Sequence, residues 1–138
     1  MIGLDTNVLA RYYIEDKADD EATKQRQAAR RLIESGKPLM VCKTVMLELE
    51  WVMRGYYGFD REEIVTIFRH LLSMPHVEIE DRESIIQALD SCELGLEFAD
   101  ALHHASYRGC STMSSFDDKK FAKRAAKLGV VPRVVVPA

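Results

Sequence analysis

The sequence predicts a single α/β domain in which helices cover both faces of a mostly parallel sheet, giving three layers. Short apolar runs alternate with segments of helical spacing along the whole chain. No linker, repeat or low-complexity tract interrupts this series, and 138 residues suffice for one core but not for two ordinary domains. We therefore expect one domain over residues 1–138.

Residues 2–4 form an apolar run that predicts a short buried strand. Thr6 and Asn7 are turn and N-cap residue types, so the next helix is expected to begin near Val8. Residues 22–35 have apolar positions at helical spacing and are followed by a glycine and a proline, which predicts a second helix.

The middle of the chain predicts a helical hairpin. Residues 39–42 form a short apolar strand, and Thr44 is the expected N-cap of a helix through Arg54 whose apolar side includes Trp51. A second helix is expected at residues 61–73, with apolar residues on one face and a proline after its end. Glycines separate the two helices, so we expect them to pack as a hairpin.

The rest of the chain continues the alternation. Period-two or β-branched runs indicate strands, whereas apolar positions at helical spacing indicate helices, two of which end at Gly95 and Gly109. The last run lies between two prolines and is typical of an edge strand. We expect strands at 77–80, 110–114 and 134–136 and helices at 82–94, 97–108 and 117–128.

The composition, with 47% hydrophobic and 30% charged residues, is that of a soluble globular protein. Nothing approaches the roughly 20 apolar residues of a membrane helix, and no apolar signal region precedes Asp5, so a cytoplasmic location is expected. Cys42, Cys92 and Cys110 lie among apolar residues without C-x-x-C spacing, which predicts small core residues in a reducing compartment.

The formal net charge of -3 argues weakly against a nucleic-acid partner, because phosphate binding relies on clustered Lys and Arg. The charge is nevertheless segregated along the chain. Acidic residues cluster at 15–21 and 78–81, whereas basic residues gather between Lys119 and Lys127. This basic segment is either a solvated helix face or a phosphate contact.

Asp5 is the first candidate functional residue, because it follows a predicted strand directly. Ligands bind at the carboxyl edge of open α/β sheets, where strand ends and helix N-termini converge. Considered alone, Asp5 would be a helix cap. Glu48 is the second candidate, since it projects toward the same edge from the first turns of a helix that follows a strand. Glu50 is expected to be a plain surface charge.

Asp100 is the third candidate and lies in a predicted helix of mostly apolar residues, where a carboxylate needs a partner. Glu97 and His104 share its face, one turn away on either side. The alternative to a functional role is a buried ion pair of Asp100 with His104 or a lysine.

Asp117 is the fourth candidate and repeats the strand-then-acid arrangement of Asp5. Ser115 offers a hydroxyl that can bond a neighbouring carboxylate or a bound water. Considered alone, Asp117 and the adjacent Asp118 would be helix caps.

Four carboxylates from four strand-helix units, those of Asp5, Glu48, Asp100 and Asp117, are thus expected near one sheet edge. Clustered carboxylates repel one another, so raised pKa values or bound cations must offset their charges. All-oxygen ligation selects Mg²⁺ or Mn²⁺ rather than zinc. Such a metal activates water and orients a phosphodiester, so hydrolysis of a nucleic-acid backbone is the expected reaction.

The order and spacing of these residues resemble the PIN-domain ribonucleases, and more narrowly the VapC-type toxins of bacterial toxin-antitoxin pairs. The likeness covers nearly the whole chain and rests on residues 2–9, 45–51, 98–103 and 115–117. It implies a PIN-like fold and a metal-dependent endoribonuclease that uses Mg²⁺ or Mn²⁺. It also implies a protein that is often a homodimer and is silenced by a cognate antitoxin, whose C-terminal segment covers the active-site groove.

The resemblance assigns roles by position. Asp5, Glu48, Asp100 and Asp117 look like the family's catalytic and metal-binding acids, and Thr6, Asn7 and Ser115 resemble its supporting polar residues. Two positions depart from the usual pattern: Ser115 stands where many relatives have Thr, and Glu97 stands where many have Asp, which leaves its role as an outer ligand open.

Cations that border the acidic site are the expected RNA contacts, namely Arg11, Arg54, Lys119 and Lys120. Four tyrosines are expected either to stack on bases or to fill a dimer interface: Tyr12, Tyr13, Tyr56 and Tyr57.

Two other functions are compatible with part of this pattern. A phosphotransferase of the haloacid-dehalogenase kind also begins with an Asp after its first strand, but it normally needs a second Asp where this chain has Asn7. A catalytically silent PIN-like module would bind only RNA or a protein. The intact acids argue against a silent module.

Overall fold

The computed structural model describes the backbone of all 138 residues and every side chain except that of Asp118. Within this described part, seven α-helices and two π-helical segments alternate with five strands, and every strand pair is parallel. The predicted α/β class with parallel strands is therefore confirmed. The chain divides into two compact units, Met1–Glu80 and Asp81–Ala138, here called unit 1 and unit 2, and each is described by itself.

The sheet of unit 1 has the order β1-β2-β3, formed by Ile2–Gly3, Leu39–Val41 and Val77–Ile79. β2 is the central strand, and both of its outer residues are buried. β1 is a terminal strand of this sheet, so Ile2 is 40% exposed and the prediction of a buried first strand is wrong there. Leu4, just beyond β1, is buried and donates its amide to the Met40 carbonyl.

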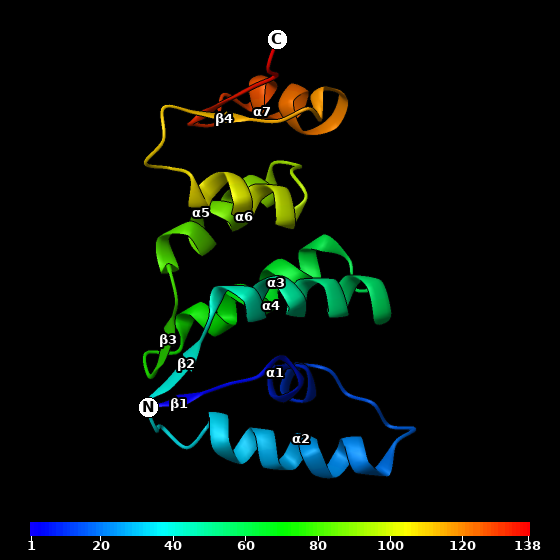
Figure 1. Ribbon diagram of the computed structural model, residues 1–138. Helices are drawn as coiled ribbons and strands as arrows, with labels where there is room; N and C mark the ends of the chain where they lie inside the picture. The colour runs from blue at the N-terminus through cyan, green and yellow to red at the C-terminus, as the bar shows by residue number, and fades with distance from the viewer. The chain divides into compact units, whose positions relative to one another are not determined.

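Two helices follow β1 in unit 1. α1 (Thr6–Tyr13) and α2 (Asp20–Ile33) pack side by side, as Figure 1 shows. The sequence indicated Thr6 and Asn7 as turn and N-cap residues. In the structure the N-cap of α1 is Asp5, and Thr6 and Asn7 are the first two residues of the helix. Asp5 occupies the N-cap position because its carboxylate accepts a hydrogen bond from a backbone N–H at the start of the helix.

The predicted hairpin is present. α3 (Lys43–Trp51) continues into the π-helical segment η1 (Val52–Tyr56) and is followed by α4 (Arg61–Ser73), with Asp60 and Glu63 forming a capping box at the start of α4. A left-handed turn at Gly58 (φ +69°) separates the two helical segments.

Two details of the hairpin differ from the sequence prediction. Cys42 occupies the N-cap of α3, and Thr44 lies inside the helix with its hydroxyl 3.2 Å from the Cys42 Sγ. Trp51 is 60% exposed, because the buried apolar residues of α3 and η1 are Met46, Leu49 and Met53, whose spacing defines another face.

Unit 2 contains two packed helices, α5 (Arg82–Glu93) and α6 (Phe98–Ser106). A second parallel pair follows, β4 (Thr112–Ser114) with β5 (Arg133–Val135), and between these strands lie η2 (Asp118–Ala122) and α7 (Lys123–Leu128). β4 starts two residues later than predicted, so Cys110 lies before the strand and is exposed.

The cysteines therefore fit the sequence prediction only in part. Cys92 is a buried core residue, Cys42 is half-buried and Cys110 is exposed, and all three are free thiols. In the part of the chain that is described, no helix has the length and apolar character needed to cross a membrane.

Candidate active site

Asp5 connects β1 to α1 and is exposed. Its backbone is extended (φ -81°, ψ 161°), and its Oδ1 accepts the Thr6 backbone N–H at 2.8 Å. The capping role considered for this residue is thus real. One hydrogen bond leaves most of the acceptor capacity of the carboxylate available, so capping does not prevent Asp5 from also binding a cation.

Thr6 is 5% exposed, and its Oγ1 has no hydrogen-bond partner among the described residues. Asn7 follows on the exposed side of α1. A buried hydroxyl without a partner is uncommon and normally has a structural or functional reason. Thr6 therefore places an unsatisfied polar group directly beside Asp5.

Glu48 is exposed and lies in the second turn of α3. The register pairs Gly3 with Met40, so β1 and β2 end at the same edge, where Asp5 begins α1 and Cys42 begins α3. α1 also packs against α3. Asp5 and Glu48 consequently stand at the start and in the second turn, respectively, of two adjacent helices that leave the same sheet edge.

Glu50 differs from its neighbour in α3. It is only 5% exposed, and both of its carboxylate oxygens accept from the Nε of Arg54 at 3.1 Å. The prediction of a plain surface charge is wrong, because Glu50 lies on the buried side of α3 and needs this partner. Arg54, an expected RNA contact, is already engaged in an ion pair, although its side chain is largely exposed.

Asp100 lies in the first turn of α6 and is half-buried. The pKa of its carboxyl lies above the usual range, first because burial penalises the charged form, and then because the carboxylates of Glu97 and Asp117 repel it. His103 and Arg124 partly offset these effects. Asp100 therefore stands in an acidic environment that favours either a proton or a cation.

Asp117 follows β4 and caps η2. Its Oδ1 accepts the backbone N–H groups of Lys120 at 3.1 Å and Phe121 at 3.4 Å. Ser115 supports it from the strand side, since its Oγ accepts the Asp117 N–H at 3.1 Å. The Ser115 N–H in turn donates to the Val135 carbonyl at 2.9 Å, which ties the candidate acid to β5.

The alternative pairing of Asp100 with His104 is not what the structure shows. His104 is 1% exposed, its Nε2 lies 2.6 Å from the Pro132 carbonyl oxygen, and its Nδ1 has no partner among the described residues. The histidine whose charge acts on Asp100 is His103, one residue earlier.

Sequence reasoning missed two residues near Asp100. His103 stands three positions after Asp100 on α6. The charge of Arg124, on α7, also acts on Asp100, and the Arg124 Nη1 donates to the Gly95 carbonyl at 3.1 Å. The i, i+3 spacing was a usable signal for His103. Arg124 is one of several exposed basic residues in the segment from Lys119 to Lys127, so composition alone did not single it out.

The four tyrosines lie in unit 1. Tyr12 donates to Glu34 at 3.3 Å, and the Tyr13 hydroxyl is 2.8 Å from the Nδ1 of His70. Both line a pocket of about 410 Å³. Tyr56 and Tyr57 make an edge-to-face contact on and after η1.

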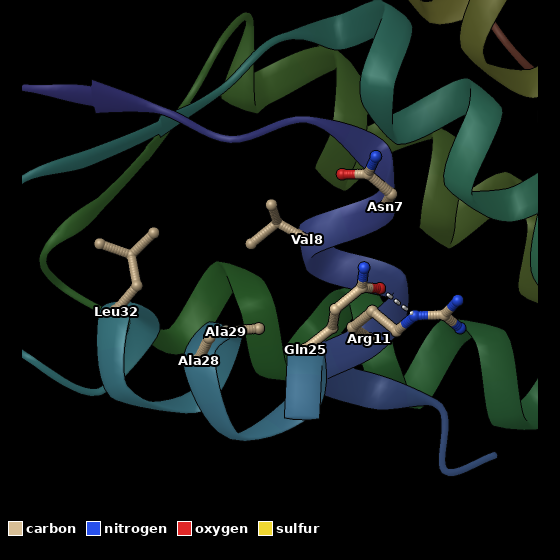
Figure 2. Close-up of a pocket in the computed structure, with 7 residues that line it drawn as sticks. All are labelled: Asn7, Val8, Arg11, Gln25, Ala28, Ala29 and Leu32. Atoms are coloured by element: carbon tan, nitrogen blue, oxygen red, sulfur yellow. Dashed lines mark hydrogen bonds between the residues drawn. The ribbon is translucent and has the colours of Figure 1, made fainter. Parts of the chain in front are cut away.

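A second pocket, of about 310 Å³, lies between α1 and α2. Figure 2 shows the hydrogen bond by which the Arg11 Nε donates to the Gln25 Oε1 across the two helices, at 2.8 Å. Asn7 lies at the start of α1, two residues after Asp5, and the rest of the wall is apolar. Arg11, another expected RNA contact, is thus part of this pocket.

The donor set fits a hard divalent cation chemically. The candidate ligands are carboxylate oxygens, and burial with the charges of Glu97 and Asp117 raises the pKa of Asp100, an effect that a nearby positive charge would oppose. Among the described side chains, no group of three or more His, Cys, Asp or Glu residues stands in a metal-holding arrangement. Asp5 and Glu48 belong to unit 1, and Asp100 and Asp117 to unit 2, so a four-acid site stays a prediction.

A comparison with protein families identifies the family of this chain. The model of the family described as PIN domain covers residues 2–127, which include all four candidate acids and cross the boundary between the two units. A comparison with curated proteins finds no match.

Proposed function

The chain belongs to the PIN-domain family, whose members are nuclease-type domains, and on this premise we propose that it is a metal-dependent endoribonuclease, the toxin of a type II toxin-antitoxin pair. The proposed reaction is hydrolysis of RNA phosphodiester bonds with Mg²⁺ or Mn²⁺. The narrower toxin assignment rests on the VapC-like order of residues 2–9, 45–51, 98–103 and 115–117.

The environment of Asp100 is the observation that supports this proposal most strongly. Burial and two neighbouring carboxylates raise its pKa, an arrangement that is costly for stability and has a clear use at a cation site. A bound divalent ion would lower the pKa of a water molecule and stabilise charge on the phosphate oxygens. We propose that Asp100 and Asp117 hold this ion together with Asp5 and Glu48.

The supporting residues have distinct proposed roles. The Ser115 hydroxyl orients Asp117 by accepting a hydrogen bond from the Asp117 backbone N–H. Thr6 places its unpartnered hydroxyl beside Asp5. Glu97 adds negative charge at the start of α6 and is a candidate outer ligand. His103 and Arg124 oppose the repulsion around Asp100 and lower its pKa.

The proposal includes partners and location. RNA is expected to contact Arg11, Lys119 and Lys120, and to a lesser extent the ion-paired Arg54. A cognate antitoxin and a second copy of the chain are the proposed protein partners. The cytoplasm is the proposed location, where three free cysteines stay reduced. One catalytic domain over residues 1–138 is also proposed, because the family match crosses both units.

Cleavage assays with purified protein test this function. RNA cleavage should require Mg²⁺ or Mn²⁺, stop with a chelator and be lost in Asp5→Asn and Asp100→Asn. Matched variants Asp20→Asn and Glu78→Gln, at exposed acids outside the site, should cut like the parent. Cleavage that survives in both site variants would contradict the proposed mechanism.

Thermal unfolding with and without metal gives a test that does not depend on finding the right RNA. An ion that binds only the folded state stabilises it by mass action, by about 2.7 kcal/mol at a hundred times its Kd. The melting temperature should therefore rise with Mg²⁺ or Mn²⁺ in the parent and much less in Asp100→Asn. An equal response in both would favour a catalytically silent module that binds RNA or protein.

A further inference from the structure

The pocket between α1 and α2 has one polar side and one apolar side. Its polar groups are those of Asn7, Arg11 and Gln25, and its apolar wall is formed by Val8, Ala28, Ala29 and Leu32. Its volume of about 310 Å³ is at the small end of the range for ligand pockets. A hollow of this size suits one flat ring system and not an extended ligand.

The polar side has one hydrogen bond between the helices and still has unused hydrogen-bonding groups. The bond between the Arg11 Nε and the Gln25 Oε1 links these two side chains across the helices. The Nη groups of Arg11, the amide nitrogen of Gln25 and the whole amide of Asn7 have no hydrogen-bond partner among the described residues. Amide and guanidinium groups in fixed positions are the groups that proteins use to bind base edges.

The apolar side has room because α2 has two alanines there. Ala29 is buried, whereas Ala28 is exposed, and Val8 faces them from α1. An apolar wall beside fixed hydrogen-bond donors and acceptors suits an aromatic base, which has an apolar face and a polar edge. An aliphatic side chain of a partner protein would leave all three polar groups unpaired.

The surroundings of the pocket suit a polyanion. Lys24 and Arg31 are exposed on α2, and their spacing from Ala28 places them on the same helix face as this pocket residue. Neither has a hydrogen bond or ion pair among the described residues. Phosphates on either side of a bound base would meet these cations.

The pocket is close to the proposed chemistry along the chain. Asn7 lies in the first turn of α1, next to Thr6 and two residues after Asp5. A base in the pocket would therefore belong to a nucleotide near the scissile phosphate held at Asp5. We propose that this pocket binds one base of the RNA substrate and sets the sequence preference of cleavage, with Gln25 and Asn7 as its specificity-determining residues; this inference rests on the proposed function.

The first test measures base preference during cleavage. The parent and three variants, Gln25→Leu, Ala28→Leu and Gln27→Leu, are given an RNA with a randomised region, and the cut sites are sequenced. Gln25→Leu removes the amide and Ala28→Leu fills the hollow, so each should lower the discrimination between bases at one position by about tenfold. Gln27 is exposed on α2 outside the pocket, so Gln27→Leu is the matched control and should keep the preference of the parent.

The second test detects binding without catalysis. The side-chain amide signals of Asn7 and Gln25 are followed by NMR while AMP, CMP, GMP or UMP is added to the parent chain. One nucleotide should shift both amide signals, and the shift should be reduced at least fivefold in Ala28→Leu. Circular dichroism confirms that the variants are folded.

The outcomes separate the two proposals. Failure of the parent to cut RNA counts against the proposed function, while the nucleotide titration still tests the pocket. The base pocket is wrong if Gln25→Leu and Ala28→Leu cut with the preference of the parent. It is also wrong if the amide signals respond to no nucleotide, or equally to all four, and the hollow would then be assigned to a side chain of a partner protein.

Discussion

The candidate acids of unit 1 and those of unit 2 lie in different surroundings. Asp5 and Glu48 of unit 1 are exposed, and Asp5 stands two residues before Asn7, which lines the pocket between α1 and α2. Asp100 of unit 2 is half-buried and feels the repulsion of Glu97 and Asp117. Under the proposed function, unit 2 would concentrate negative charge for a cation, and unit 1 would position the RNA.

The largest expected effect is at Asp100. Asp100→Asn should lower RNA cleavage by at least about a hundredfold, because the change removes a proposed metal ligand. The variant should unfold at the same temperature as the parent or above it, since the charge it removes is disfavoured in the folded state. Cleavage rates and melting curves of the same preparations check both expectations. A loss of activity with a lower melting temperature would indicate a structural role instead.

Asp5 allows the capping and metal-binding roles to be separated. Asn is as good a helix cap as Asp, so Asp5→Asn should keep the stability of α1 while cleavage falls by about a hundredfold. Asp5→Ala should lose the same activity and also about 1 kcal/mol of stability. Denaturant unfolding and cleavage assays on the two variants give the comparison. If Asp5→Asn cleaves RNA as fast as the parent, Asp5 acts only as a helix cap and not as a metal ligand.

Glu48 and Glu50 form a second matched pair within α3. Glu50→Gln weakens a buried charge interaction with Arg54 and should cost about 1–3 kcal/mol of stability while cleavage persists. Glu48→Gln should reduce cleavage and leave stability unchanged within about 0.5 kcal/mol, because Glu48 is exposed. Urea unfolding and cleavage rates measure both. The reverse pattern would exchange the roles assigned to the two residues.

The smallest expected effect is the pH dependence of stability near Asp100. Its folded pKa is raised above the unfolded value, so the stability penalty is absent below the unfolded pKa and is fully present above the folded one. The stability advantage of Asp100→Asn over the parent should therefore shrink as the pH falls toward the ordinary pKa of an aspartate. Melting temperatures over a series of acidic buffers measure this difference. An advantage that stays constant with pH would point to a cause other than charge.

Most of the fold could be predicted from the sequence, because each element has its own local signal. The helix at residues 61–73 has apolar positions on one face and a proline after its end, and α4 has these bounds. The errors in the predicted fold arose where tertiary packing determines which face of a helix is buried. Trp51 has helical spacing with apolar neighbours, yet the buried face of α3 is the one containing Met46 and Leu49.

The candidate site was harder to predict than the fold. Strand-then-acid spacing identified Asp5 and Asp117, and both follow strands in the structure. The burial of Glu50 and the influence of His103 and Arg124 on Asp100 depend on which helix face packs inward, and a single sequence does not specify this. Asp100 was predicted to need a partner; two acids, Glu97 and Asp117, repel its charge, and His103 and Arg124 oppose this effect in place of the expected His104.

The hydrogen bonds of β5 and of Pro132, just before it, have a practical consequence for protein engineering. The family match ends at residue 127, but the Pro132 carbonyl bonds His104 of α6, and the Val135 carbonyl bonds Ser115 just before Asp117. A recombinant chain trimmed at the family boundary would keep all four acids and lose the backbone groups that anchor two of the segments bearing them. The last eleven residues should therefore be retained in any expression vector meant to report on catalysis.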